Sequence, residues 1–376
     1  MINIGKILKR SWQILWNYRI LWIFGVLLAL TGAGSNPSSN PGSSPQTPQN
    51  STTNYPGALP EGSPEWVRQL SQWFVQDVEP LFTHPLEHVG TILAIAGIFF
   101  LIILVLSALA AIVRYPTETA VFRMVDEYEH SGKKMGFRQG WKLGWTRRAF
   151  RLWLIDLVLA IPALVFVLLI AGAGLIAYLS VSSTYQVTNA VGVVAAIGLG
   201  FVSLFFLIVV SVFLNLLRNF MARAAALEGL GVNESMQYGW AMFRRNWKSA
   251  GLMWLVMIGI WFGIGIVGLI VFFLLIPAYL VMLIPAAIAA ILPGLIAFGV
   301  TSIFASSPLA WIIAFLAAAP FFFIILFAPL LVFLGWYKIY ESNVWTLTYR
   351  EIKALESLSA PASPVEGAQR TENNPA

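Results

Sequence analysis

Cysteine does not occur in the 376 residues of this chain, and histidine occurs only three times. Disulfide bonds, thiolate metal sites and cysteine nucleophiles are therefore excluded, and cysteine usage says nothing about the redox compartment. Charge is scarce as well, since 11% of the residues are charged, against roughly 25% in an average soluble domain. This composition argues against a soluble protein.

Apolar residues are abundant. They make up 58% of the chain and give a mean hydropathy of +0.77. A helix needs on the order of 20 apolar residues to cross a bilayer core. Runs of about this length occur at 18–33, 89–113, 152–178, 191–217, 251–276 and 308–336. The sequence therefore predicts an all-α fold, a polytopic integral membrane helix bundle with six transmembrane helices.

The uncharged stretch 277–307 is also apolar enough for a seventh span. Pro277, Pro285, Pro293 and Pro308 divide it, and a proline inside a helix removes a backbone hydrogen bond. We therefore expect this stretch to form short helical pieces, as a re-entrant or interfacial hairpin on the outer side of the membrane. Seven spans remain the alternative.

The distribution of positive charge predicts the orientation. With six spans and the N-terminus inside, every Lys and Arg except Arg68 lies on the inner side, as the positive-inside rule requires. A seventh span would move Lys338, Arg350 and Lys353 outside. We therefore expect both termini in the cytoplasm. The net charge of +6 then belongs to inner membrane-facing segments and does not indicate a nucleic-acid partner.

The first apolar run also resembles a cleavable signal peptide, because basic residues and an apolar core precede the small residues of 31–34. Its lead segment carries Trp12, Trp16 and Tyr18, which suit an interfacial anchor better than a short basic leader. A similar pattern of Trp and Arg residues before an apolar run recurs later in the chain. We therefore predict an uncleaved first helix.

That recurring phrase, in which Trp and Arg residues precede an apolar run, occurs at 11–22, 140–153 and 235–247. Polar inner segments that also look alike occur at 119–123, 222–228 and 343–347. The pattern predicts three pseudo-repeated helix pairs, about 1–135, 136–234 and 235–358, within a single membrane domain over 1–358.

The lead segments of the three repeats are predicted to be interfacial amphipathic helices. Their rings fall on one helical face, and their cations lie around its edge. Such a helix lies at the membrane surface with its rings at headgroup depth and its cations against anionic lipid. It acts either as an anchoring elbow before a span or as a headgroup-binding site. The residues concerned are Trp12, Trp16, Trp141, Trp145, Arg147, Arg148, Trp240, Arg244, Arg245 and Trp247.

Three further segments are predicted outside the spans. Residues 34–63 are rich in Ser, Pro, Asn and Gly, a composition that favours a disordered outer linker. Residues 64–82 read as an amphipathic helix on the outer membrane face. The tail 359–376 is predicted to be disordered and cytoplasmic.

Asp156 is the one carboxylate inside a predicted span, and an ionisable residue there is a functional candidate. It lies near the inner end of its span, within reach of Arg218 and close to Asn215 on the fourth span. We expect a structural ion pair with Arg218, and keep a proton or ion pathway as the alternative.

Two motifs are weak. The sequence His84-Pro85-Leu86-Glu87-His88 fits the H-x-x-E-H pattern of zinc peptidases, but its proline opposes the helix that would hold both histidines on one face. We expect no metal and no cofactor. Glycines at 263, 265 and 268 fit G-x-G-x-x-G, but they lie within a span, where with Gly259 they predict a close helix-packing face.

The six-span layout, the Ser11-Trp12-x-x-x-Trp16 opening and the passage from Ala224 to Gly231 and on to Trp240 resemble a broad group of prokaryotic membrane proteins of unknown function. Their layout is similar to the membrane domain fused to some glycerophosphoryl diester phosphodiesterases. The likeness covers most of 1–350 and leaves no room for a catalytic barrel of about 250 residues. The resemblance implies a membrane module without the hydrolase, in the plasma membrane of a prokaryotic cell.

Together these observations predict a non-enzymatic membrane module. Its basic, Trp-rich cytoplasmic surface would engage anionic lipid or a partner protein. The alternative is a transporter or channel for a small or lipid-like solute, suggested by the repeats and the Pro-broken segment. A membrane enzyme using His84 and His88 is the third hypothesis.

Overall fold

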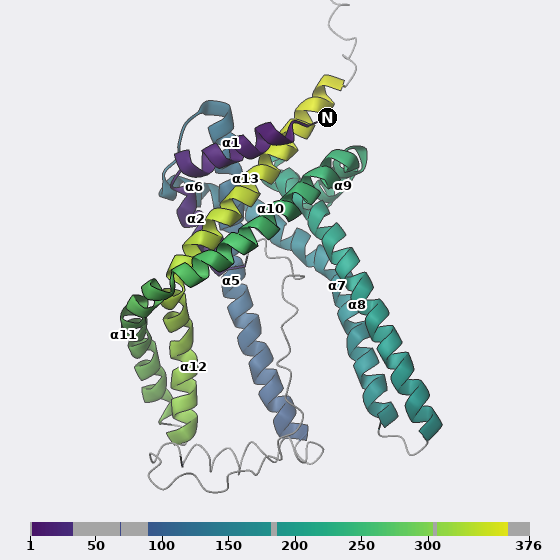
Figure 1. The fold of residues 1–376 in the computed structure, drawn as a ribbon, viewed down its shortest axis with the longest axis vertical. Coiled ribbons are helices and arrows are strands. Elements are labelled where there is room, and N and C mark those ends of the chain that lie inside the picture. Colours follow the sequence, from purple (N-terminus) through teal and green to yellow (C-terminus); the bar gives the residue numbers. More distant parts are fainter. Residues whose placement is uncertain (1, 33–67, 69–88, 182–185, 304–306, 360–376) are drawn as a thin grey trace, which may run out of the picture. The chain divides into compact units, whose positions relative to one another are not determined.

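A computed structural model describes residues 2–32, 68, 89–181, 186–303 and 307–359 (Figure 1). Every regular element in these residues is a helix. The helices are α1 (Ile4–Asn17), α2 (Leu21–Leu30), α5 (Val89–Ser131), α6 (Phe137–Gly144), α7 (Arg147–Val181), α8 (Gln186–Arg223), the π-helix η2 (Ala224–Glu228), α9 (Val232–Arg245), α10 (Trp247–Leu274), α11 (Ile276–Thr301), α12 (Ser307–Leu326) and α13 (Ala328–Ser359). The all-α prediction is confirmed.

Some predictions fall outside the described residues. These are the linker 34–63, the outer helix 64–82 apart from Arg68, the His84 to His88 motif, and all but the first residue of the tail 359–376.

The chain divides into two compact units, each made of separate stretches. Unit 1 contains 1–24, 115–261 and 338–376, and unit 2 contains 25–114 and 262–337. These boundaries cut across the three predicted repeats, which remain a prediction. Helices α5, α10 and α13 each contribute residues to both units.

Among the described residues, four helices are long and apolar enough to cross a membrane: 147–180, 190–228, 247–274 and 276–301. Two bent helix pairs raise the possible number to six if each pair is one span. The predicted spans 152–178, 191–217 and 251–276 coincide closely with the first three helices, and the predicted 89–113 lies within α5. The sequence therefore located three of these four candidate spans and placed 89–113 within a helix, and that 89–113 crosses a membrane stays a prediction.

The predicted first span, 18–33, belongs to the more sharply bent pair. Helices α1 and α2 meet at an angle of 101°, and α2 is only ten residues long. Tyr18 lies buried at the bend. Its hydroxyl donates to the Met135 carbonyl at 3.0 Å and accepts from the Met135 amide at 2.6 Å. These two bonds hold the turning point of the chain against the segment that precedes α6.

The predicted span 308–336 is also bent, by 67° between α12 and α13. Pro329 explains the position of the bend, because proline lacks an N–H and disfavours helical geometry in the residue before it. The ring of Phe327 lies at this break, stacked on Phe323 with centroids 6.1 Å apart. A single straight helix over 308–336 is therefore absent.

The expectation of short pieces over 277–307 is wrong. Helix α11 continues through Pro285 and Pro293 as one helix of 26 residues. A helix in an apolar environment tolerates an internal proline when local adjustments satisfy the backbone groups that the proline leaves without a hydrogen bond. Pro277 lies in the first turn of α11, where a proline removes no helical hydrogen bond. This stretch is therefore a candidate span in its own right.

Small residues bring the helices of each hairpin together. In unit 1, α7 and α8 lie side by side (Figure 1). A methyl group added at Gly192 would collide with Ser180, and one at Gly200 would contact Ala173. In unit 2, α11 packs on α12, and a Cβ at Gly294 would lie 3.3 Å from Ala318. Close backbone approach at small residues is the usual packing mode of helices in membranes.

The glycine face predicted on α10 does not form within the described residues. A Cβ added at Gly259, Gly263 or Gly265 would meet no atom within 4 Å, and only Gly268 approaches another residue, Phe333. The G-x-x-x-G spacing predicts that another helix can pack closely against these glycines, but it does not identify that helix.

Candidate functional site

The three predicted polar inner segments, 119–123, 222–228 and 343–347, form much of the core of unit 1. Nearly all their residues are buried, including Thr119, Arg223, Asn343 and Thr346. These buried polar residues lie among a larger number of buried apolar side chains of unit 1, such as Ile14, Met124 and Ile339.

Arg218 on α8 holds two carboxylates from two other helices. Its Nε lies 2.5 Å from Asp156 Oδ1 on α7, and its Nη1 lies 2.8 Å from Glu118 Oε1 on α5. Both pairings are bidentate. The Tyr115 hydroxyl donates to Asp156 Oδ2 at 3.1 Å. The ion pair predicted between Asp156 and Arg218 is present, and Glu118 is the partner that the sequence did not reveal.

The side chains of this cluster are largely buried. The side chains of Glu118, Arg218 and Asp156 are 9%, 14% and 16% exposed. Removing charges from water is costly unless they are paired and hydrogen-bonded, and planar bidentate contacts with arginine provide strong pairing. Among the described residues, no hydrogen bond joins the Asn215 side chain to this cluster; its backbone carbonyl accepts from the side-chain amide of Asn219. The geometry is that of a structural clamp joining three helices.

Arg223 is a second buried arginine, 2% exposed, one turn and a half beyond Arg218. Unlike Arg218, it makes no ion pair with any described residue. Its guanidinium donates to Asn219 Oδ1 at 3.1 Å and to Thr346 Oγ1 at 3.3 Å, and it lies 4.4 Å from the centroid of the Phe122 ring. The cation–π contact and the hydrogen bonds offset part of its desolvation. Arg223, itself in the segment 222–228, thereby contacts residues of the other two polar segments.

Asn343 lies beside this junction and is fully buried. Among the described residues, neither its Nδ2 nor its Oδ1 has a hydrogen-bond partner, and the neighbouring Ser342 Oγ is also unbonded. The backbone carbonyl of Ser342 accepts from Arg223 Nη2 at 3.2 Å. A buried amide without partners is unfavourable, so Asn343 destabilises this core.

Two arginines of α7 cap the end of the π-helix η2. Arg148 Nη1 donates to the carbonyls of Ala226 and Leu227, and Arg151 Nη1 donates to those of Gly229 and Leu230. The carbonyls at a helix end lack intrahelical partners, and cations there also oppose the helix dipole. Arg148, predicted as a surface residue, therefore has an internal role.

Arg123 adds to this crowding of cations. Its Nη1 donates to the Leu143 carbonyl at 3.0 Å. Burial first, and the nearby Arg148 second, lower the pKa of the Arg123 guanidinium below its usual value. The positive charges near η2 are therefore held by backbone carbonyls more than by acids.

Most of the predicted surface tryptophans are exposed. Trp12, Trp16, Trp145, Trp240 and Trp247 are between 40% and 59% exposed. Trp141 is half-buried and stacks on Phe137 and Trp145. Large exposed rings next to cations are typical of interfacial anchors.

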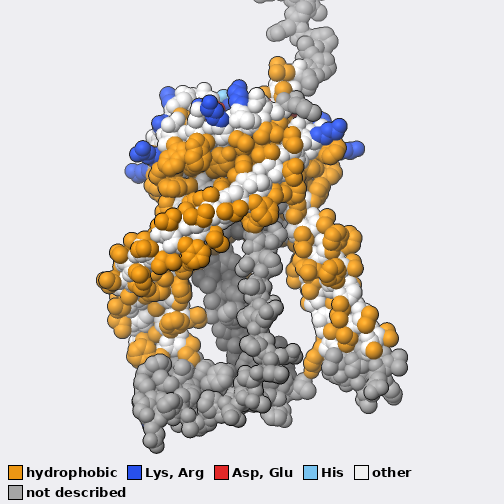
Figure 2. All heavy atoms as spheres, viewed as in Figure 1, with side chains coloured by type: hydrophobic (Ala, Val, Ile, Leu, Met, Phe, Trp, Pro, Cys, Tyr) orange, Lys and Arg blue, Asp and Glu red, His pale blue; other side chains and the backbone are white. Residues whose placement is uncertain are grey.

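Charges in unit 1 are sorted by sign. Most of the acids form ion pairs: Glu129 with Arg10, Asp126 with Arg350, Glu228 with Lys353, Glu356 with Arg245, and Glu341 with Lys338. Glu127, Glu234 and Glu351 have no ion pair within the described residues. Many exposed cations have no ion pair within the described residues, among them Lys6, Lys9, Arg19, Arg138, Lys142, Arg147, Arg244 and Lys248. Figure 2 shows Lys and Arg side chains gathered at the end of unit 1 that carries α1 and α9, and apolar side chains along α7 and α8.

We define the basic aromatic surface as the exposed Trp12, Trp16, Trp145, Arg147, Trp240, Arg244, Trp247 and Lys248. It contains most of the residues predicted for lipid contact. Arg148 is removed from it by its backbone partners at η2, and Arg245, although exposed, is paired with Glu356. Sequence reasoning missed Glu118, Arg223 and Asn343, although a charged or amide residue among small apolar residues was the available signal.

The described residues contain no cluster of three or more potential metal ligands from His, Cys, Asp and Glu. Comparison with protein families matches residues 8–341 to a family of unknown function, DUF7544. Searches of curated proteins and of solved structures found no match.

Proposed function

Because the chain belongs to that family of unknown function, its role has to be argued from its own geometry, and we propose a non-enzymatic integral membrane module. In this proposal the basic aromatic surface of unit 1 faces the cytoplasm and binds anionic lipid headgroups. The resemblance to the membrane domain of glycerophosphoryl diester phosphodiesterases supports a module of this kind without a hydrolase.

The observation that carries the proposal is the sorting of charge. Most acids in unit 1 are paired with cations, whereas Arg147, Arg244 and Lys248 are exposed and have no acidic partner among the described residues. Trp247 lies beside Lys248, whose Nζ is 5.9 Å from the ring centroid. A cation beside an exposed indole suits the boundary between headgroups and acyl chains.

The buried cluster supports a module over a transporter. Asp156, the residue on which a transport pathway would depend, has both carboxylate oxygens engaged by Arg218 and a further bond from Tyr115. Releasing Asp156 would leave buried charge uncompensated. We therefore assign Asp156, Arg218 and Glu118 a structural role.

The proposal is tested by lipid competition on the full-length protein. Native mass spectrometry would compare binding of phosphatidylglycerol and phosphatidylcholine with identical acyl chains to the wild type and to the Arg147→Gln/Arg244→Gln/Lys248→Gln variant. We expect the variant to lose roughly tenfold or more of the preference for the anionic lipid, because each cation near an anionic surface contributes about 1 kcal/mol.

The control is Lys133→Gln/Lys134→Gln, which removes exposed cations from the segment before α6, outside the defined surface. It should lower the preference less. An equal loss in both variants would show that the lipid preference depends only on the net charge of the protein and not on this particular surface. An unchanged preference in the first variant would overturn lipid binding and favour an acidic partner protein.

A further inference from the structure

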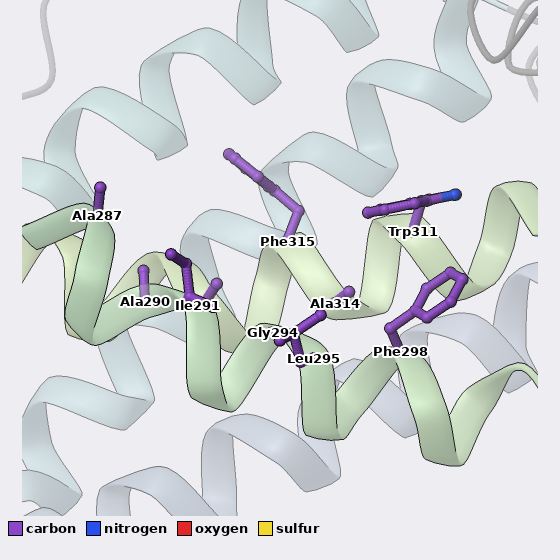
Figure 3. Close-up of a pocket in the computed structure, with 10 residues that line it drawn as sticks. Ala287, Ala290, Ile291, Gly294, Leu295, Phe298, Trp311, Ala314 and Phe315 are labelled. Carbon is purple, nitrogen blue, oxygen red and sulfur yellow. The ribbon is translucent and has the colours of Figure 1, made fainter.

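A groove runs between α11 and α12 in unit 2, with a volume of about 400 Å³ (Figure 3). On α11 its lining residues recur every three or four positions from Ala287 to Phe298, along one face of the helix. On α12 they run from Trp311 to Ala318 with the same spacing. The groove therefore follows the helix axes and is elongated.

The floor and walls of the groove differ in size. Ala290, Gly294, Ala314 and Ala318 form a floor of small residues, and a Cβ at Gly294 would lie 3.3 Å from Ala318. Larger side chains stand at the rim and at one end, where the rings of Phe298 and Trp311 pack with centroids 4.5 Å apart. Every lining residue is apolar, so the groove has no groups to hold water or a polar ligand.

The surroundings restrict the occupant to something apolar. Helix α11 is a candidate span, and its exposed residues beside the groove include Ile288, Leu292 and Ile296. The medium around such a face is hydrocarbon. Two occupants then compete: a helix, such as one from a second copy of this chain, and a single hydrocarbon chain.

The shape of the groove favours the hydrocarbon chain. From Ala287 to Phe298 the groove is roughly 16 Å long at 1.5 Å per residue, so a volume of about 400 Å³ gives a mean cross-section of about 25 Å². A helix about 10 Å in diameter is too wide to enter a groove of this cross-section and could contact it only through its side chains, whereas a single hydrocarbon chain can lie along its whole length. If a methylene group occupies roughly the volume of a water molecule, about 30 Å³, the groove accommodates on the order of 13 methylene groups.

We propose that the α11–α12 groove binds one hydrocarbon chain of a lipid, with the polar end of that lipid beside Phe298 and Trp311. Phe298 lies close to the end of α11 at Thr301, and Trp311 lies close to the start of α12 at Ser307. Figure 3 shows the two rings at one end of the groove and Ala287 at the other, with the indole nitrogen of Trp311 directed away from Ala287. Tryptophan at such a position is typical of the headgroup level.

The test uses two photoreactive fatty acyl probes on the full-length protein in lipid nanodiscs. One carries a diazirine near the carboxyl end and the other near the methyl end, and labelled residues are located by mass spectrometry. The proposal predicts that the first probe labels Phe298 and Trp311 and that the second labels the Ala287 to Ile291 end. Even labelling of all exposed apolar helix faces, or the reverse polarity, would overturn it.

Filling the groove provides a second readout. Ala287→Phe/Ala290→Phe should lower labelling of α12 severalfold, and the matched control Ala289→Phe, on the same helix but outside the lining, should leave it unchanged. Equal labelling in both variants contradicts the proposal. So does efficient cross-linking between two copies of an Ala290→Cys variant, which would identify a helix as the occupant. The wild-type labelling pattern remains decisive if the filled variant does not fold.

Discussion

Arg218 on α8 and Glu118 on α5 are one hundred residues apart in sequence and form a bidentate ion pair with both N–O distances at 2.8 Å. The same guanidinium also holds Asp156 of α7. One side chain therefore joins three helices. The arrangement makes Arg218 the residue on which the core of unit 1 most depends.

Replacing Arg218 by Met should destabilise the protein strongly. The substitution leaves two buried carboxylates without a cation, and breaking a buried pair from one side costs about 3–5 kcal/mol. The matched control is Arg244→Met, at an exposed arginine without an ion pair among the described residues. Thermal unfolding of the purified protein in detergent measures both, and a similar small shift for the two variants would show that the clamp contributes little.

Gly144→Ala should destabilise the packing of α6 on α5. A Cβ there would collide with the Pro116 carbonyl and lie 2.9 Å from Ala120 Cβ, and overpacking of this kind costs about 1–3 kcal/mol. Gly174→Ala on α7 serves as the control, because its Cβ would meet nothing within 4 Å. The same unfolding measurement applies, and equal stability of the two variants would contradict the close contact.

Gly229→Ala should loosen the connection between η2 and α9. Gly229 has a φ of 72°, and a left-handed conformation costs an L-residue about 1–2 kcal/mol. Gly231→Ala, two positions away at a φ of −62°, should be tolerated. Hydrogen exchange of the Ala224 to Leu230 amides should accelerate only in the first variant. Acceleration in both would point to a loop that is sensitive to any added side chain.

Asn343→Leu should stabilise the protein. The amide is fully buried and neither of its polar atoms is bonded, so an apolar side chain of similar size removes a desolvation penalty of about 1–3 kcal/mol. Thermal unfolding provides the measurement, with Thr346→Val as a contrasting variant that removes a bonded hydroxyl and should destabilise. A loss of stability in Asn343→Leu would mean that a bound water or ligand partners this amide.

Salt should separate the two proposed lipid contacts. The Debye length falls from about 10 Å at 0.1 M to about 3 Å at 1 M ionic strength, so preference for phosphatidylglycerol on the basic aromatic surface should weaken as salt rises. Labelling in the α11–α12 groove rests on apolar contact alone and should not weaken. Native binding and photolabelling at both salt concentrations check this, and parallel changes would argue that both readouts report one site.

The sequence predicted several features of unit 1 because they are local. The exposed Trp240 could be placed from helical spacing, and the Asp156 to Arg218 pair could be inferred from the depth of each residue in its span. Trp247, predicted on the same helical face as Trp240, is exposed but begins a separate helix, α10. Glu118 could not be inferred in the same way, because its distance from Arg218 depends on how three helices pack. The sequence predicted Arg148 at the surface, whereas in the structure its guanidinium donates a hydrogen bond to the carbonyl of Ala226.

By itself, the sequence determined the all-helical class and most of the apolar helices, since a run of about 20 apolar residues is legible from composition alone. Only the tertiary structure decided that the chain bends at Tyr18 and Phe327 but continues through Pro285 and Pro293. It also decided which charges are buried and which remain exposed. The reason is physical: a bend or a burial depends on partners that arrive from distant parts of the chain, and periodicity along one helix does not record them.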